Sequence, residues 1–263
     1  MIGVVGVGAM GAALVEGLLT AGHSPETIFL VEQDEAKLES FGERGVHVSS
    51  EMEGIRTADW VIVAVKPHAV VEVLRAMAVE LNPAAAVISI AAGIDTRSIE
   101  AELPSVSVVR AMPNTPALVG QAMIGVAPGR LVTPEQLHEA CDILGAVGQV
   151  AIVGEADLDA LTAVSGSGPA YLFYLAEALV EAAQEQGLSA DLADRLVRQT
   201  LRGAGLLLAT SDVDAAELRR RVTSKGGTTE AAIEVFDTGN MKGTIGRAVH
   251  AATERSRQLR GDS

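Results

Sequence analysis

The 263-residue sequence has few aromatic residues, a single cysteine and no long run of uncharged apolar residues. Aromatic residues make up only 3% of it, so we expect a core of Ala, Val, Leu and Ile. Cys141 has no partner for an intrachain disulfide, which is typical of the reducing cytoplasm, and we expect a small, buried apolar residue there. Because no stretch of about 18 uncharged apolar residues and no basic leader segment occurs, we expect a cytoplasmic protein without a membrane span.

Basic residues are also scarce, since 20 Lys and Arg stand against 34 Asp and Glu and give a net charge of -14. Nucleic-acid-binding proteins present a basic face, and adhesion to anionic membranes requires basic clusters. The charge therefore argues against both kinds of partner. The five histidines are scattered without the spacing of metal ligands, so we expect no metal site.

Apolar strand-like segments alternate with helical segments in the first part of the sequence. The expected strands cover residues 2–6, 28–31, 46–48, 60–65, 86–90, 106–110, 123–126 and 150–153. This alternation predicts an α/β fold with βαβ units and a mostly parallel sheet in the N-terminal part. From residue 157 onward, helices rich in small and apolar residues replace the strands. We expect an α/β domain over residues 1–154 and an all-helical dimerisation domain over residues 155–263, which buries its apolar surface against a second copy.

A glycine-rich turn follows the first expected strand and reads Gly6-Val7-Gly8-Ala9-Met10-Gly11. In a strand–turn–helix context this spacing is typical of dinucleotide binding. Gly6 permits the tight turn, Gly8 lets the backbone approach a pyrophosphate, and Gly11 lets the helix pack on the strand. A turn that needs glycine for structural reasons alone is the alternative.

Glu32 occupies the position, about 20 residues after the turn, where an acidic residue binds the ribose of NAD. A carboxylate there accepts from the ribose hydroxyls and repels the extra phosphate of NADP. No lysine or arginine adjoins Glu32, because Gln33, Asp34 and Glu35 follow it. The electrostatics therefore favour NADH, and a solvated loop charge is the alternative.

Polar residues follow two further expected strands, at the edge where ligands bind in such sheets. Lys66 and Pro67 follow the strand over 60–65, and Asn114 lies in a stiff Pro-Asn-Thr-Pro turn after the strand over 106–110. Lys66 suits a phosphate or ribose, with a solvated surface lysine as the alternative. Asn114 is a candidate nicotinamide contact, with a purely structural turn as the alternative.

Two segments rich in glycine and hydroxyl groups precede helices in the second half. Residues 165–171 lead into a long helix, but no strand precedes them as a hydrolase nucleophile elbow requires. Residues 223–230 read Thr-Ser-Lys-Gly-Gly-Thr-Thr-Glu and open another helix. Their hydroxyls and backbone N–H groups suit a small carboxylate, and ordinary N-capping is the alternative.

These segments together resemble the pyrroline-5-carboxylate reductase family. The resemblance runs from residue 2 to about 258 and rests on GVGAMG, AVKPH, SIAAGI, RAMPNTPALVG, SGSGPAY and TSKGGTTEAAI. It implies reduction of 1-pyrroline-5-carboxylate to L-proline with NADPH or NADH, the last step of proline biosynthesis. It also implies a Rossmann domain, a helical domain that interlocks into a homodimer, assembly of dimers into rings such as decamers, and a substrate site at the dimer interface.

Matched residue by residue, the resemblance implies a cofactor site and a substrate site. The matching cofactor residues are Gly6, Gly8, Ala9, Met10, Gly11, Lys66 and Ala92. The matching substrate residues are Glu155, Ser224, Gly227, Thr228 and Thr229. Thr229 matches a residue that hydrogen-bonds the substrate and assists the imine nitrogen, so it is the candidate catalytic residue. Glu155 matches an acidic residue near the ring.

Three positions depart from the family pattern. Lys225 stands where many relatives have proline, which removes a backbone constraint and adds a charge beside the carboxylate loop. Glu51 roughly aligns with a common asparagine, so that contact is not carried over. NADPH-preferring members have small polar or basic residues after the second strand, where this sequence has Glu32.

Two rival functions fit parts of the sequence. A β-hydroxyacid dehydrogenase shares the glycine-rich start and a helical second domain, but it uses a lysine on the interdomain helix. No lysine occurs here between Lys66 and Lys225, which argues against that rival. A non-catalytic dinucleotide sensor is the second rival, and the intact loop over 223–229 argues against it.

Overall fold

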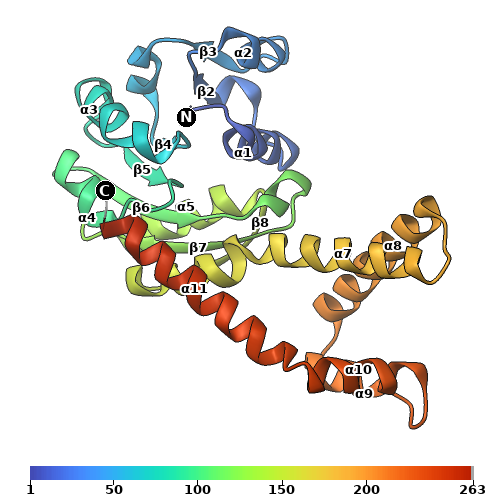
Figure 1. Ribbon diagram of the computed structural model, residues 1–263. Coiled ribbons are helices and arrows are strands. Elements are labelled where there is room, and N and C mark those ends of the chain that lie inside the picture. Colours follow the sequence, from blue (N-terminus) through green and yellow to red (C-terminus); the bar gives the residue numbers. More distant parts are fainter. Residues whose placement is uncertain (262–263) are drawn as a thin grey trace. The chain divides into compact units, whose positions relative to one another are not determined.

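The computed structural model describes residues 1–261 and contains an eight-stranded sheet (Figure 1). The strands lie in the order β3-β2-β1-β4-β5-β6-β7-β8. They are β1 (Ile2–Val5), β2 (Ile28–Val31), β3 (His47–Ser49), β4 (Trp60–Val63), β5 (Ala86–Ser89), β6 (Ser107–Met112), β7 (Ala122–Pro128) and β8 (Gly148–Ile152). The pairs are parallel except for β6 with β7. The predicted α/β fold with a mostly parallel Rossmann-type sheet is confirmed.

Helices cover both faces of this sheet. One face packs against α1 (Ala9–Thr20), α2 (Glu35–Gly42) and α5 (Pro134–Gly145). The other face packs against α3 (Val70–Glu80) and α4 (Thr96–Glu102). Strands β1, β4 and β5 are buried along their whole length, which explains why their sequences are continuous apolar runs.

Cys141 lies on α5, is half-buried and packs against the aliphatic core, in line with the expected apolar role. Burial, with a smaller contribution from Asp142, raises the pKa of its thiol. A thiol with a raised pKa is mostly protonated near neutral pH, so Cys141 is a poor nucleophile.

The sequence predicted a strand over 123–126, and β7 is longer and runs antiparallel to β6, a direction that the sequence did not predict. Only a short 3-10 helix, Thr115–Val119, separates β6 from β7, and it ends at Gly120 with φ of 67°. A parallel crossover needs a dozen or more residues, so this connection forces the chain to run back beside β6. Helix α4 was also missed, because it is short and only Ile99 on it is buried.

The chain forms two compact units. The first is Met1–Ser167 together with the end of the chain from Ala252, and the second is Gly168–Ala251. Helix α11 (Met241–Gly261) begins in the second unit and ends in the first. The functional boundary between residues 154 and 155 stays a prediction.

The second unit is helical throughout and leaves much apolar surface exposed in the single chain. It consists of α7 (Gly168–Glu185), α8 (Ala190–Thr210), α9 (Ala215–Arg221), α10 (Thr228–Thr238) and the first part of α11. Its exposed large apolar side chains include Leu172, Phe173, Tyr174, Leu206, Leu207, Leu208, Val235 and Phe236. Apolar surface on this scale is characteristic of a protein–protein interface. Within residues 1–261, no helix is both long and apolar enough to span a bilayer.

Candidate functional site

The glycine-rich turn between β1 and α1 is shaped by two glycines that the protein itself requires. Gly6 has φ of 96°, and a Cβ there would lie 2.8 Å from Val65 Cγ1. A Cβ on Gly11 would lie 2.1 Å from the carbonyl oxygen of Gly6. The first clash would displace the loop after β4, and the second would push α1 away from the turn. Both positions therefore exclude any larger residue.

Gly8 differs from these two glycines because nothing in the protein lies within 4 Å of the place its Cβ would take. Gly8 is the N-cap residue of α1, and no side chain caps this helix. Gly8 and Ala9 are exposed, and Met10 is half-buried. The uncapped N–H groups and the dipole of α1 favour an anion at this open position. The turn therefore fits the pyrophosphate of a dinucleotide.

Glu32 directly follows β2, and its carboxylate reaches the glycine-rich turn. The backbone N–H of Val7 donates to Glu32 Oε2 over 2.9 Å, and that of Gln33 donates to Oε1 over 2.9 Å. Partial burial alone would raise the pKa of Glu32, but hydrogen bonds from Val7, Asp34 and Gln33 and the charge of Lys37 outweigh it and lower the pKa. Glu32 is therefore a charged acceptor beside the turn, and its contact with a ribose stays a prediction.

Lys37 is the cation that the sequence reading overlooked near Glu32. It lies on α2, with its Nζ 3.7 Å from Glu32 Oε2 and 3.5 Å from Asp34 Oδ2. The helix brings it back towards the strand end, although five positions separate it from Glu32 in the sequence. Lys37 thus partly offsets the negative charge at this corner.

Two arginines that follow Glu32 in the sequence, Arg44 and Arg56, pair with other carboxylates. Arg44 forms two hydrogen bonds with the carboxylate of Glu16. Arg56 pairs with Glu80. Both guanidinium groups are therefore paired with carboxylates other than that of Glu32.

Lys66, Pro67 and Ala92 all lie on the same edge of the sheet as the glycine-rich turn. Lys66 and Pro67 follow β4 and Ala92 follows β5, and these neighbouring strands pair in parallel up to Val63 and Ser89. The three residues are exposed. Because parallel strands end at a common edge, the structure brings together the cofactor residues that the resemblance implied.

The side chain of Asn114 has a structural task. Its Nδ2 donates to the carbonyl oxygen and hydroxyl of Ser165 at 3.1 and 3.2 Å, and its Oδ1 accepts from the N–H of Met123 at 3.0 Å. Asn114 therefore ties the Pro-Asn-Thr-Pro turn to β7 and to the serine–glycine segment. This favours the structural alternative, and a nicotinamide contact by Asn114 stays a prediction.

Glu155 pairs with a buried arginine of the sheet. Its Oε1 accepts from Arg110, which lies on β6 and is only 2% exposed. This pairing places Glu155 in the first unit as the counter-ion of Arg110. Its contact with a substrate ring stays a prediction.

The hydroxyl-rich loop in the second unit ends at an uncapped helix. Helix α10 begins at Thr228 after Gly227, and no side chain caps it. A Cβ on Gly227 would lie 2.5 Å from Ser224 Oγ, so the loop folds tightly over itself. In the described part of the chain, the hydroxyls of Ser224, Thr228 and Thr229 make no hydrogen bond with the protein. Free hydroxyl and N–H donors at a helix start form a receptor for a small carboxylate.

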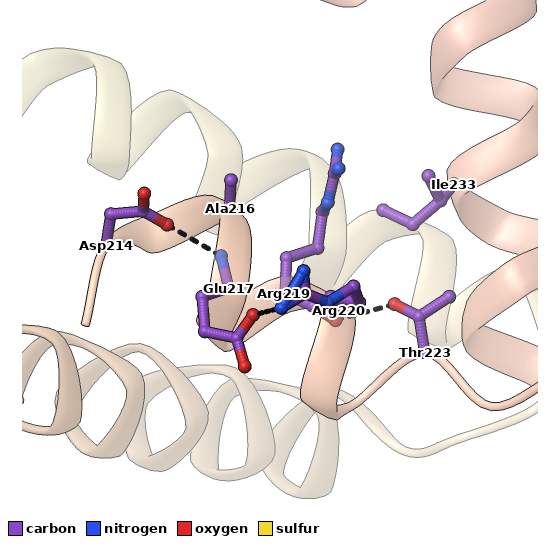
Figure 2. A pocket seen from close by; sticks show the side chains of 7 residues that line it. All are labelled: Asp214, Ala216, Glu217, Arg219, Arg220, Thr223 and Ile233. Atoms are coloured by element: carbon purple, nitrogen blue, oxygen red, sulfur yellow. Dashed lines mark hydrogen bonds and ion pairs between the residues drawn. The ribbon is translucent and has the colours of Figure 1, made fainter.

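A pocket of about 480 Å³ borders this loop within the second unit (Figure 2). Its lining residues are Asp214, Ala216, Glu217, Arg219, Arg220, Thr223 and Ile233. Thr223 donates its hydroxyl to the carbonyl oxygen of Arg219 over 2.7 Å, which fixes the start of the loop on the end of α9. Arg220 pairs with Glu217, whereas Arg219 forms no ion pair within residues 1–261.

Sequence reasoning missed Arg110 and Asp159, which are the buried charges of the first unit. Arg110 gives a visible signal, because it interrupts the apolar strand Ser107–Met112. Asp159 gives none, because its partners lie about 100 positions away in the sequence. No group of metal-ligating side chains occurs among the described residues.

Two family models each match one part of the chain. Residues 155–259 match the family described as pyrroline-5-carboxylate reductase dimerisation. Residues 1–93 match the family described as NADP oxidoreductase coenzyme F420-dependent. The first match covers the segment in which the sequence predicted a dimerisation domain.

Full-length relatives and solved structures agree with these matches. A pyrroline-5-carboxylate reductase of Pseudomonas aeruginosa is 42% identical, with 98% of this chain and 96% of that protein covered. The structure of such a reductase from Coxiella burnetii is 37% identical, with a TM-score of 0.93 over 98% of this chain and 97% of that one. The Plasmodium falciparum enzyme, solved with NADP bound, is 30% identical, with a TM-score of 0.86 over 98% and 97% of the two chains. The chain belongs to the pyrroline-5-carboxylate reductase family of NAD(P)-dependent oxidoreductases.

Proposed function

We propose that the protein reduces 1-pyrroline-5-carboxylate to L-proline with a hydride from NADH or NADPH, as the last step of proline biosynthesis. One observation carries this proposal. A single chain of this family combines an open, uncapped dinucleotide turn at Gly8 with an uncapped helix start at Thr228 that has free hydroxyl donors.

The substrate residues in this proposal divide between binding and chemistry. The N–H groups at the start of α10, with Ser224 and Thr228, hold the carboxylate of the cyclic imine. The hydroxyl of Thr229 hydrogen-bonds the ring nitrogen and orients it. A helix start favours an anion, so the same dipole that binds the carboxylate also fixes the orientation of the ring.

The reaction requires little acid–base machinery from the protein. The protonated imine is an electrophile: its C=N π electrons move to nitrogen as the hydride adds to carbon, and the neutral ring amine forms. The bound nicotinamide cofactor supplies that hydride. Thr229 holds the nitrogen, and the carboxylate clamp limits rotation of the ring, so positioning provides most of the acceleration.

The cofactor residues in this proposal are those at the common edge of the sheet. Gly6, Gly8, Ala9, Met10 and Gly11 hold the pyrophosphate. Lys66, Pro67 and Ala92 contact the cofactor along the same edge. Glu32 accepts from the adenosine ribose, so NADH serves at least as well as NADPH.

The proposal extends to assembly and location. The exposed apolar helices of the second unit pair with a second copy to form a homodimer, and the dimers assemble into a larger ring. The protein acts in the cytoplasm on a small-molecule substrate, without nucleic acid or membrane.

A turnover assay tests the proposed activity and separates it from both rivals. The purified protein is incubated with NADH or NADPH and either the cyclic imine, a β-hydroxyacid with the oxidised cofactor, or no second substrate. The proposal predicts loss of reduced cofactor only with the imine and formation of proline. Turnover of the hydroxyacid alone would support a dehydrogenase, and cofactor binding without any turnover would support a sensor.

A further inference from the structure

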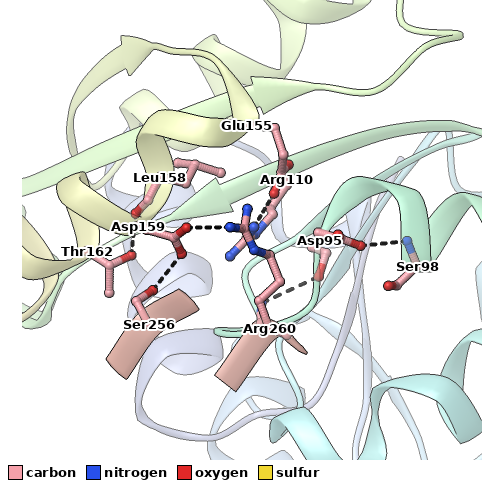
Figure 3. A network of polar contacts seen from close by, with 11 residues as sticks. Asp95, Ser98, Arg110, Glu155, Leu158, Asp159, Thr162, Ser256 and Arg260 are labelled. Carbon is pink, nitrogen blue, oxygen red and sulfur yellow. Dashed lines mark hydrogen bonds and ion pairs between the residues drawn. The ribbon is translucent and has the colours of Figure 1, made fainter. Parts of the chain in front are cut away.

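The last turns of α11 carry two side chains to one buried carboxylate of the first unit. Ser256 donates its hydroxyl to Asp159 Oδ1 over 2.9 Å, and Arg260 Nη2 lies 2.7 Å from Asp159 Oδ2 (Figure 3). Asp159 is only 1% exposed. Positions 256 and 260 are one helical turn apart and so lie on the same face of α11. The spacing thus brings one hydroxyl donor and one cation to the same carboxylate.

The charge of Arg260 also acts on the carboxylate of Asp95. Burial of Asp95 alone would raise its pKa, but its hydrogen bonds with Ser98 and the charges of Arg110 and Arg260 outweigh burial and lower the pKa. Asp95 Oδ1 accepts from the N–H of Ser98 over 2.8 Å and so caps the start of α4. The charge at the end of α11 therefore favours the ionised form of the residue that caps α4.

The turn between β5 and Asp95 lies directly against α11. Gly93 in this turn has φ of 79°, and a Cβ there would lie 3.4 Å from the carbonyl oxygen of Leu259. Ala91 and Ile94, on either side, are buried, whereas Ala92 is exposed. The last turn of α11 thus packs against the segment that contains Ala92, which lies at the edge of the sheet.

Other charged pairs on the same part of α11 have a different character. Arg257 pairs with Glu254 one turn earlier on its own helix, and both side chains are largely exposed. Such an exposed pair contributes little to stability, and it joins the helix to no other segment. Asp159, by contrast, is a buried charge that is costly to leave without a partner, so it strongly favours the docked position of Arg260.

We propose that Arg260 is a positioning residue for the cofactor: through its ion pair with Asp159 it holds the end of α11 against the turn at Ala91–Gly93 and so fixes Ala92. The inference rests on the proposed function only in taking Ala92 as a cofactor contact. Loss of Arg260 frees the turn without removing any group that touches the imine. It therefore weakens cofactor binding and leaves the clamp on the substrate carboxylate intact.

Cofactor titrations of the full-length protein test this inference without any imine present. The dissociation constants of NADH and NADPH are measured by nicotinamide fluorescence for wild type, Arg260→Met and Arg260→Lys. Arg257→Met is the matched control, because it removes an arginine from the same helix without touching Asp159. We expect Arg260→Met to raise both constants at least about fivefold, the low end of couplings between distinct sites. Arg260→Lys restores part of the loss because it keeps the charge but not the planar fork.

Kinetics, a second variant and hydrogen exchange distinguish the positioning role from a general loss of structure or a failure to fold. Steady-state kinetics of Arg260→Met should show a raised KM for the cofactor and a nearly unchanged KM for the imine. Ser256→Ala removes one hydrogen bond to Asp159 and should produce a smaller shift in the same direction. Hydrogen exchange of the peptide over residues 90–95 should quicken in both variants and not in Arg257→Met.

Cofactor constants equal to those of wild type in Arg260→Met would overturn the inference. Equal rises of both KM values, or the same change in Arg257→Met, would also overturn it. Failure of the proposed function is distinct, since a protein that turns over no imine but loses cofactor affinity in Arg260→Met still supports the positioning role.

Discussion

The carboxylate of Glu32 accepts a hydrogen bond from the backbone N–H of Val7 over 2.9 Å, which joins the end of β2 to the dinucleotide turn. In the proposed cofactor site, this contact places a charged acceptor at the corner where the two nicotinamide cofactors would differ. NADH brings a ribose hydroxyl that the carboxylate can accept from, whereas NADPH brings a phosphate that it repels. Lys37, 3.7 Å from Glu32, reduces that repulsion but offers a single charge instead of a fork of donors.

Replacement of Glu32 should therefore change the choice of cofactor. Wild type should show kcat/KM for NADH equal to or above that for NADPH, measured at saturating imine. Glu32→Ser should shift the ratio towards NADPH by about 1.5–3 kcal/mol, the range for a hydrogen bond to a charged group. A strong NADPH preference in wild type would mean that Glu32 does not meet the ribose.

Two control variants locate the effect of Glu32. Glu35→Gln removes a neighbouring charge at the first turn of α2 and should leave the ratio nearly unchanged. Lys37→Met, combined with Glu32→Ser, should cancel part of the gain for NADPH, because Lys37 is then the cation left for the phosphate. If the double variant shows the same shift towards NADPH as Glu32→Ser alone, Lys37 does not bind the phosphate.

The stabilising hydrogen bonds of Glu32 should make unfolding depend on pH. The pKa of Glu32 is lowered in the folded protein, so its charged form stabilises the fold at every pH above 4.5, the ordinary pKa of a glutamate. This stabilisation is lost as the pH falls from 4.5 through the lower pKa of the folded state. The difference in free energy of unfolding between wild type and Glu32→Gln should thus narrow as the pH falls below the ordinary pKa. Denaturant titrations at neutral and acidic pH measure it. A constant difference means that Glu32 is not held charged by the turn.

Loss of the Thr229 hydroxyl should reduce turnover without loss of the fold. The hydroxyl has no hydrogen-bond partner in the described chain, so Thr229→Ala should change stability by less than the ~1 kcal/mol of a typical cap. The variant should lower kcat while the dissociation constant of the cofactor stays near that of wild type. Thr238→Ala, at the other end of α10, is the matched control. Wild-type kcat in Thr229→Ala removes this hydroxyl from the mechanism.

A charge placed in the apolar surface of the second unit should break the dimer. Phe173 on α7 is 67% exposed in the single chain, and Phe173→Glu would bury a charge in the interface. Light scattering at micromolar concentration should find a dimer or larger assembly for wild type and a smaller species for the variant. Val79→Glu is the control, because Val79 is 80% exposed but lies on α3 of the first unit. A stable wild-type monomer would exclude the shared interface.

The fold was largely predictable because its signals are local. Continuous apolar runs such as Trp60–Val63 predict strands buried on both faces, and the spacing of Gly6, Gly8 and Gly11 predicts a dinucleotide turn. The strand β7 was predicted but its antiparallel direction was not, because direction depends on the length of the connection after β6 and not on the strand's own residues. The residue types over 223–230 predicted a receptor for a small carboxylate before α10, and the resemblance supplied the cyclic imine and the roles of the individual residues.

The partners of charged residues were not predictable, because they lie far apart in the sequence. Asp159 meets Ser256 and Arg260 only after α11 returns to the first unit. Lys37 lies in the first turns of α2, and this helix brings its Nζ to within 3.7 Å of Glu32 although the two residues are not adjacent in the sequence. Glu155 was expected near the substrate, and its pairing with Arg110 depends on an arginine inside an apolar strand.

Transfer of deuterium tests the central claim of hydride transfer to the imine most directly. NADH and NADPH carrying deuterium at the transferable position of the nicotinamide are incubated with 1-pyrroline-5-carboxylate and the purified protein, and the product is analysed by mass spectrometry. We predict L-proline with one deuterium on the ring carbon that was double-bonded to nitrogen, formed by wild type and far more slowly by Thr229→Ala. Oxidised cofactor without deuterated proline, or proline without deuterium, would contradict the account.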